Sequence, residues 1–240
     1  MSVRLERTAK FSVLSLDAFS AAKNNKLSDE AAAARFESLS REVSYETARN
    51  TSRLERASLP TPDAPNLTYG EVEYKSLAVI LDKVRDEGGL DGKELVFVDL
   101  GSGCGRPIIA AGLLHPFRHL IGIEILDGLH SLALNLKDAW DAQQDKDELG
   151  LGEVEFVHGS ILEHDWPERA DVILANSTCF SIPFFADIER MARRCRPGTF
   201  FVSLTHCLGL EDRQAHWELV ETLRLEMSWG AADVCVHRRR

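Results

Sequence analysis

Short apolar runs alternate with amphipathic stretches through most of the chain, and this alternation predicts the fold. The apolar runs are rich in β-branched and aromatic residues, which is typical of buried strands. The stretches between them carry apolar residues at every third or fourth position, as amphipathic helices do. The pattern predicts strands at residues 95–100, 120–124, 154–157, 171–175 and 199–204, and helices at about 106–115, 127–143 and 184–194. Strands that alternate with helices predict an α/β fold with a parallel, doubly wound sheet.

The C-terminal part of the chain departs from this alternation. Residues 223–229 and 234–237 look like a closing hairpin, which would add an antiparallel edge to the sheet. The run from His237 to Arg240 is the only dense basic cluster, and we expect it to be a solvated end.

The N-terminal part predicts helices that precede the α/β domain. Ser28 stands before an acidic, alanine-rich stretch that resembles a capped helix. Prolines at 60, 62 and 65 break any helix and indicate a linker. We therefore expect a helical N-terminal extension and linker at residues 1–65 and one domain at residues 66–240. That domain begins with a helix whose apolar positions are Leu77, Ile80, Leu81 and Val84, and Gly88 and Gly89 end it.

The first predicted strand is followed by a glycine-rich turn. Gly101, Gly103 and Gly105 lack a Cβ, so the backbone there can adopt positive φ and lie close against a ligand. Pro107 is tolerated in the first turn of the next helix, where its missing N–H would have no partner. A strand, a glycine turn and a helix start predict a nucleotide-type site at the carboxyl end of a parallel sheet.

The spacing of the glycines narrows the class of ligand. Dinucleotide-binding turns have the pattern G-x-G-x-x-G, whereas this turn has G-x-G-x-G with Asp99 two residues before it. The stretch from Asp99 to Gly105 resembles the first motif of seven-strand S-adenosylmethionine-dependent methyltransferases. In that family the acid and the glycine backbone hold the methionine part of the cofactor, which here implies Asp99, Gly101, Ser102, Gly103, Gly105 and Arg106. A plain tight loop is the alternative reading of the glycines.

Three further strand ends carry polar residues. Glu124 ends the second strand, where an acid can accept hydrogen bonds from both ribose hydroxyls of an adenosine cofactor. Ser160 and Ile161 follow the third strand, at the position that meets the adenine in these methyltransferases. Asn176 follows the fourth strand together with Phe180, beside the place of methyl transfer, where a buried amide needs a partner such as a substrate amine. The alternative for Glu124 and Ser160 is an ordinary loop residue.

A narrower resemblance rests on several motifs in order. The chain carries Tyr69-Gly70-Glu71, then Asp99-Leu-Gly-Ser-Gly103, Gly122-Ile-Glu124, Asn176 with Phe180, and Ser228-Trp229. Over residues 66 to 237 it resembles the histone-lysine methyltransferases of the disruptor-of-telomeric-silencing type. The resemblance implies a Rossmann-like seven-strand sheet, S-adenosyl-L-methionine as cofactor, and a histone or another basic protein as substrate.

The resemblance also implies roles for particular residues. Tyr69, Gly70 and Glu71 match the loop that closes over the methionine moiety, and Asn176 matches an asparagine at the methyl-transfer site. Trp229 matches an aromatic residue that lines the lysine channel, and Phe180 and Tyr69 are further candidates for its wall.

Four departures from the family pattern stand beside these matches. Arg106 replaces a glutamine, Ser160 replaces an aspartate, channel tyrosines are missing near residues 234–237, and the DNA-contacting basic extension is absent.

The composition of the chain limits which partners, metals and locations are expected. The net charge is −10, which argues against a broad phosphate-binding surface and implies weak or no direct DNA binding. The cysteines are odd in number and widely spread, so neither a disulfide framework nor a zinc site is indicated, and no metal is expected. No apolar run is long enough to span a membrane, so we expect a soluble intracellular protein, in nucleus or cytoplasm.

The sequence therefore predicts a protein-lysine methyltransferase, with two alternatives. One is a methyltransferase for a small molecule or another protein side chain, and the other is a non-catalytic scaffold that binds the cofactor. The ordinary pKa of a lysine side chain, about 10.4, is about 3.4 units above pH 7. Supplying the neutral amine at pH 7 therefore costs on the order of 4.6 kcal/mol. An apolar channel lowers that pKa because it disfavours the ammonium form.

Overall fold

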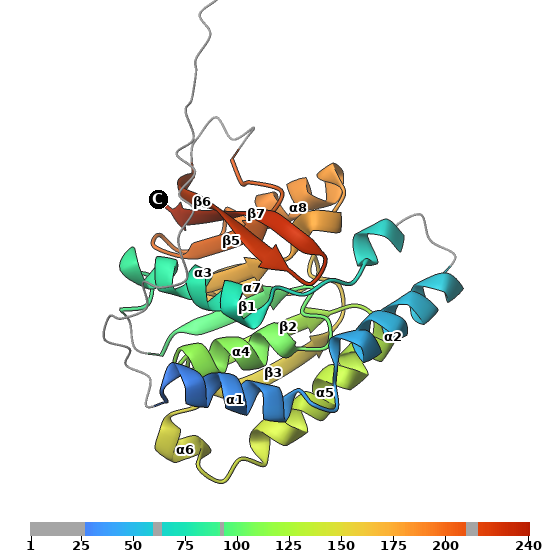
Figure 1. Ribbon diagram of the computed structural model, residues 1–240. Helices are drawn as coiled ribbons and strands as arrows, with labels where there is room; N and C mark the ends of the chain where they lie inside the picture. Colours follow the sequence, from blue (N-terminus) through green and yellow to red (C-terminus); the bar gives the residue numbers. More distant parts are fainter. Residues whose placement is uncertain (1–26, 60–63, 92–93, 210–215) are drawn as a thin grey trace, which may run out of the picture.

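The computed structural model describes residues 27–59, 64–91, 94–209 and 216–240 (Figure 1). In this part of the chain, seven strands form one sheet in the order β3-β2-β1-β4-β5-β7-β6. The strands are β1 (Val96–Leu100), β2 (His119–Glu124), β3 (Glu153–His158), β4 (Val172–Ala175), β5 (Phe200–Leu204), β6 (Trp217–Met227) and β7 (Gly230–Arg239). Neighbours among β1 to β5 pair in parallel, whereas β7 runs antiparallel to both β5 and β6. The predicted doubly wound sheet and its closing hairpin are confirmed.

Helices cover both faces of this sheet. The described helices are α1 (Asp29–Leu39), α2 (Tyr45–Ser58), α3 (Tyr74–Asp86), α4 (Arg106–Leu114), α5 (Asp127–Asp141), α6 (Lys146–Leu149), α7 (Trp166–Arg169) and α8 (Ile182–Ala192), with short 3-10 turns η1 (Ala64–Leu67) and η2 (Ser177–Cys179). Figure 1 shows α1 and α2 as an outer layer, where α1 contacts α4 and α5, and α2 contacts α5. The N-terminal helices therefore rest on the α/β domain at the side of α4 and α5.

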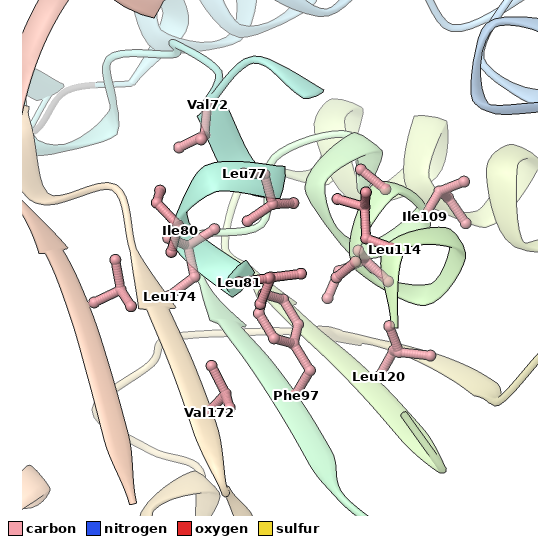
Figure 2. Packing of buried hydrophobic residues seen from close by; sticks show 14 of the residues in the cluster. Val72, Leu77, Ile80, Leu81, Phe97, Ile109, Leu114, Leu120, Val172 and Leu174 are labelled. Atoms are coloured by element: carbon pink, nitrogen blue, oxygen red, sulfur yellow. The ribbon is translucent and has the colours of Figure 1, made fainter. Parts of the chain in front are cut away.

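The larger core lies between the sheet and helices α3 and α4. Figure 2 shows Leu77, Ile80 and Leu81 of α3 pointing at side chains of the strands, with Ile109 and Leu114 of α4 beside them. The strand residues they meet are Phe97, Leu120, Val172 and Leu174. Burying one leucine or isoleucine stabilises the fold by about 1.5–3 kcal/mol before entropy is counted. The spacing of apolar residues along α3 therefore identified the face that packs on the sheet.

Less helical structure covers the second face of the sheet. Phe185 and Ile188 of α8 pack with Trp166 of α7 against Phe201 and Trp217. The connection between β3 and β4 adds the four-residue helix α7 to this layer, together with the buried side chains of Ile161 and Ala170. Helix α8 is consequently the main element here, and its N-terminus lies beside the end of β4.

Helix ends agree with the capping pattern of the sequence. The Ser28 hydroxyl oxygen accepts a hydrogen bond from the backbone N–H of Ala31 at 3.3 Å and caps α1. Gly88 follows α3 with a φ of +79°, which a residue with a side chain rarely adopts. Residues 1–26 and the linker prolines 60 and 62 lie outside the described residues.

The expectation of a solvated basic C-terminus is wrong. Strand β7 runs to Arg239, where Arg238 pairs with Phe200 of β5. The His237 ring is buried, with Nδ1 3.3 Å from the carbonyl oxygen of Phe201, and burial lowers the pKa of His237 to about 4. Charged residues tolerate a strand position here because the arginine side chains reach carbonyl and carboxylate oxygens, such as Arg239 to the His216 carbonyl at 3.0 Å.

The cysteine spacing indicated no disulfide framework, but the structure contains one disulfide that the spacing did not predict. Cys207 and Cys235 form a disulfide, with their Cα atoms 5.6 Å apart. Cys235 lies on β7 opposite Ser203, and Cys207 follows β5 by three residues, so the sheet pairing brings the two together. Cys104 and Cys195 are buried, as expected of small apolar side chains.

Candidate functional site

A cavity of about 620 Å³ opens at the carboxyl ends of the central parallel strands. Strand order reverses between β1 and β4, which is where α/β sheets bind ligands. Its lining includes Asn66, Leu67, Tyr69 and Gly70 before α3, Gly101 and Gly103 after β1, Glu124 and Leu126 after β2, Ser160 and Ile161 after β3, and Asn176, Phe180 and Phe184 after β4. The sequence had placed candidate residues at each of these four strand ends.

The glycine turn adopts the backbone that the motif predicts. Gly101, Gly103 and Gly105 have φ angles of +80°, +57° and +86°. A Cβ on Gly101 would lie 3.7 Å from the Phe180 ring across the cavity, whereas one on Gly103 would lie 2.5 Å from the Tyr69 ring. The first two glycines therefore let the main chain form the cavity wall. Gly105 lies outside that lining and makes room for Phe156 instead.

Glu124 lines the cavity and is held by two backbone hydrogen bonds. Its Oε2 accepts a hydrogen bond from the Gly103 backbone N–H and its Oε1 accepts one from the Leu126 N–H, both at 2.8 Å. Burial raises the pKa of Glu124, and the backbone N–H donors oppose that shift. Each carboxylate oxygen has further lone pairs. The carboxylate is thus oriented by the turn and can still accept hydrogen bonds from a ligand.

A narrow polar space of about 10 Å³ adjoins the large cavity and shares Tyr69, Gly101 and Asn176 with it. Asp99 lines this space and is 2% exposed, and burial together with the negative charge of Glu124 raises the pKa of Asp99 to about 8. Ser102 also lines it, and its hydroxyl, which lies beside Gly122 of β2, has no hydrogen-bond partner. Asp99 thus places a polar side chain at this end of the site.

The Tyr69-Gly70-Glu71 segment forms one wall of both spaces. The Tyr69 hydroxyl donates to Glu71 Oε1 and lies 3.0 Å from the Cys104 sulfur. Burial and nearby negative charge raise the pKa of Tyr69, so it stays protonated. Glu71 also lines the narrow space. Its Oε2 accepts a hydrogen bond from Arg106 Nε at 2.9 Å. Glu71 therefore holds the segment in place through Arg106.

Arg106 lies outside the lining of both spaces. Its guanidinium donates to the carbonyl oxygens of Ser40 and Val43, at 3.4 and 3.2 Å, and lies 4.9 Å from the centroid of the Phe36 ring. Arg106 thus ties the α1–α2 turn to Glu71 and to the glycine turn. Its predicted contact with a cofactor stays a prediction.

Of the residues predicted on the substrate side, some line the cavity and one lies outside its lining. Asn176 lines both spaces, and its Nδ2 donates to the Gly70 carbonyl oxygen at 2.8 Å. Phe180 lines the large cavity. Trp229 lies outside both linings, is 41% exposed, and packs its ring over Gly70. The proposed aromatic wall therefore consists of Tyr69 and Phe180, with Trp229 behind Gly70.

Several lining residues were not predicted from the sequence, and two of them make hydrogen bonds to distant elements. Glu55 of α2 accepts hydrogen bonds from the backbone N–H groups of Asp127 and Gly128, both at 2.8 Å, and so caps α5 beside the cavity. Asn66 accepts from the backbone N–H of Ser181 at 2.7 Å. Neither role could be predicted from neighbouring residues, because each side chain is hydrogen-bonded to an element far away in the chain.

Within the described ranges, no group of three or more histidine, cysteine, aspartate and glutamate residues gathers to hold a metal ion. The same residues contain no helix with the length and apolar character needed to cross a membrane.

This sheet order, with a glycine turn after β1 and an acid after β2, defines a Rossmann-like methyltransferase fold. The structure of TrmN from Thermus thermophilus shares the fold, with a TM-score of 0.51 at 18% identity, covering 79% of this chain and 53% of that one. Residues 62–224 match the family described as "Histone methylation protein DOT1", and the chain belongs to this family. The resemblance predicted from the motifs is confirmed.

Two curated relatives carry the name "Histone-lysine N-methyltransferase, H3 lysine-79 specific". The protein from Kluyveromyces lactis is 30% identical over 146 residues, covering 58% of this chain and 24% of that protein. The protein from Gibberella zeae is 30% identical over 141 residues, covering 57% of this chain and 27% of that protein. The similarity thus spans about a quarter of the length of these relatives.

Proposed function

We propose that the chain is an S-adenosylmethionine-dependent protein-lysine N-methyltransferase that acts on a histone or another basic protein. The observation that carries the proposal is one cavity with Glu124 fixed on one side and Asn176 on the other, and the glycine turn between them. Membership of the DOT1 family and the names of the two relatives support the lysine as acceptor.

The residues present fit S-adenosylmethionine. Glu124 would accept from the ribose hydroxyls, and Ser160 and Ile161 would meet the adenine. Asp99 and the backbone of the glycine turn, Ser102 included, would hold the charged methionine end. When bound, the cofactor supplies a methyl group on a positively charged sulfur.

The chain's own task is alignment and desolvation. The acceptor amine must approach in line with the methyl group, so a rigid wall contributes by fixing that geometry. Asn176 is held through its Nδ2 at Gly70, which leaves Oδ1 to accept a hydrogen bond from the amine. Phe180 and Leu67 make the outer lining apolar, which lowers the pKa of a lysine there and reduces the cost of losing its proton.

The charge of the chain and the names of its relatives support a substrate class and a location in the cell. An acidic chain with a net charge of −10 suits a basic protein partner better than nucleic acid. The relatives are named as specific for lysine 79 of H3, and this supports our proposal of a histone as substrate and of the nucleus as the location of this chain. We also propose that residues 1–65 form an extension to a catalytic domain at residues 66–240.

Labelled methyl transfer from the cofactor tests this function. The protein is incubated with whole cell extract and, separately, with purified nucleosomes, and the product is analysed by mass spectrometry. We expect label in lysine side chains of protein. Label confined to small molecules would exclude a protein-lysine enzyme, and calorimetric binding without any turnover would indicate a scaffold.

The raised pKa of Asp99 predicts a pH-dependent cofactor affinity. Below pH 8 the free protein holds Asp99 mainly protonated, and pairing with the cofactor ammonium requires loss of that proton. Affinity should therefore rise by about tenfold for each pH unit from pH 6 towards pH 8. Calorimetry with S-adenosylhomocysteine measures this. Asp99→Asn should bind more weakly and lose the slope, and an unchanged slope in this variant would contradict the assignment.

A further inference from the structure

The segment before α3 lines the cavity and is hydrogen-bonded at two points to the segment after β4, which also lines it. We name residues 66–71 the strap and residues 176–181 the substrate wall. Nδ2 of Asn176 in the wall donates to the Gly70 carbonyl oxygen of the strap at 2.8 Å. The backbone N–H of Ser181 in the wall donates to Oδ1 of Asn66 in the strap at 2.7 Å. Each segment thus contributes one asparagine to a pair of ties.

The two ties bracket the acceptor side of the cavity. The first lies beside the narrow polar space, which Asn176 and Gly70 both line. The second lies at the start of α8, where Ser181 and Phe184 line the large cavity but not the narrow one. The lining residues between these ties include Leu67 and Phe180. The separation of these two apolar side chains is therefore set by hydrogen bonds at both ends.

The Ser181 N–H has no partner within its own helix. Ser181 caps α8, and its hydroxyl oxygen accepts from the Phe184 N–H, so its backbone N–H points outside the helical ladder. Asn66, which is 115 residues away in the chain, accepts a hydrogen bond from this donor. A bond of this kind orders a loop more than it stabilises a core.

We propose that Asn66 is a positioning residue that fixes the outer wall of the acceptor channel. Its carboxamide holds Leu67 of the strap at a set distance from Phe180, so that a lysine side chain enters a narrow, apolar channel. The cofactor half of the site depends on Glu124 and the glycine turn and does not need this tie. The role in lysine binding rests on the proposed function, whereas the tie itself does not.

Hydrogen exchange at the Ser181 amide, followed by NMR, tests the tie directly. In Asn66→Ala the amide should exchange at least about fivefold faster than in the wild type. Asn66→Asp keeps an acceptor oxygen at the same place and places a negative charge at a helix N-terminus, so protection should return. Asn135→Ala, an exposed asparagine on α5, is the matched control and should leave exchange unchanged.

Steady-state methylation of nucleosomes tests the positioning. Asn66→Ala should raise the KM for the acceptor about fivefold to tenfold, with cofactor affinity within about twofold, and Asn66→Asp should restore it. Unchanged Ser181 exchange in Asn66→Ala, or equal loss of acceptor binding in both variants, would overturn the proposal. If the wild type methylates no protein, the proposed function fails, and the exchange measurement still decides whether the tie exists.

Discussion

Replacing Asn176 with alanine should reduce methyl transfer by at least about 10²–10³-fold while cofactor affinity changes by less than about tenfold. Asn176 stands at the end of β4, and its Nδ2 is held by the Gly70 carbonyl oxygen at 2.8 Å. The proposed function puts the acceptor amine at the remaining oxygen of Asn176, so its loss should remove orientation at the reacting atoms. The proposed cofactor contacts, at Glu124 and the glycine turn, are left in place by this change.

Initial rates with nucleosomes and calorimetry with S-adenosylmethionine separate these two effects. The exposed Asn135→Ala variant is the control for expression and folding, and circular dichroism shows whether Asn176→Ala keeps its fold. Parallel loss of rate and cofactor affinity in a folded Asn176→Ala protein would place this residue in cofactor binding instead.

Replacing Glu124 with alanine should weaken cofactor binding by at least about 100-fold, which corresponds to ~3 kcal/mol. Hydrogen bonds from hydroxyls to a charged carboxylate are about twice as strong as neutral ones, and this carboxylate would receive two from the ribose. The same change leaves the backbone N–H groups of Gly103 and Leu126 without acceptors, so we also expect a loss of about 2–4 kcal/mol in unfolding free energy.

Glu124→Gln separates binding from stability because it retains one acceptor oxygen and nearly the same volume. It should bind the cofactor much more weakly than the wild type but unfold at a higher urea concentration than Glu124→Ala. The exposed Glu163→Gln, on the loop after β3, should match the wild type in both measurements. If Glu124→Gln binds the cofactor as tightly as the wild type does, the assignment of this carboxylate to cofactor binding is wrong.

The N-terminal helices are joined to the site by two charged side chains. Glu55 of α2 caps α5 beside the cavity, and Arg106 bonds to the α1–α2 turn while it pairs with Glu71. The Arg106–Glu71 pair is largely buried, so removing one partner would leave a charge uncompensated. Arginine at position 106, where the family usually has glutamine, is therefore explained by its contacts with α1, α2 and the strap.

The sequence by itself determined the parts of the protein that depend on local pattern. The apolar run before Gly101 indicated a buried strand, and the glycine spacing indicated positive φ angles, because both depend on neighbouring residues alone. Glu124 and Asn176 were identified because each follows a strand, and the ends of parallel strands meet at one edge of a sheet. The Tyr69-Gly70-Glu71 motif pointed to the family, which residues 62–224 confirm.

Only the tertiary structure decided which distant groups pair. The Cys207–Cys235 disulfide, the buried His237 and the tie between Asn66 and Ser181 join segments whose separation in the sequence carries no signal. The same holds for Trp229, which the motif identified but which packs over Gly70 outside the cavity. Local patterns specify backbone conformation and burial, whereas a hydrogen bond or disulfide across the sheet depends on how the strands are ordered and how the helices pack.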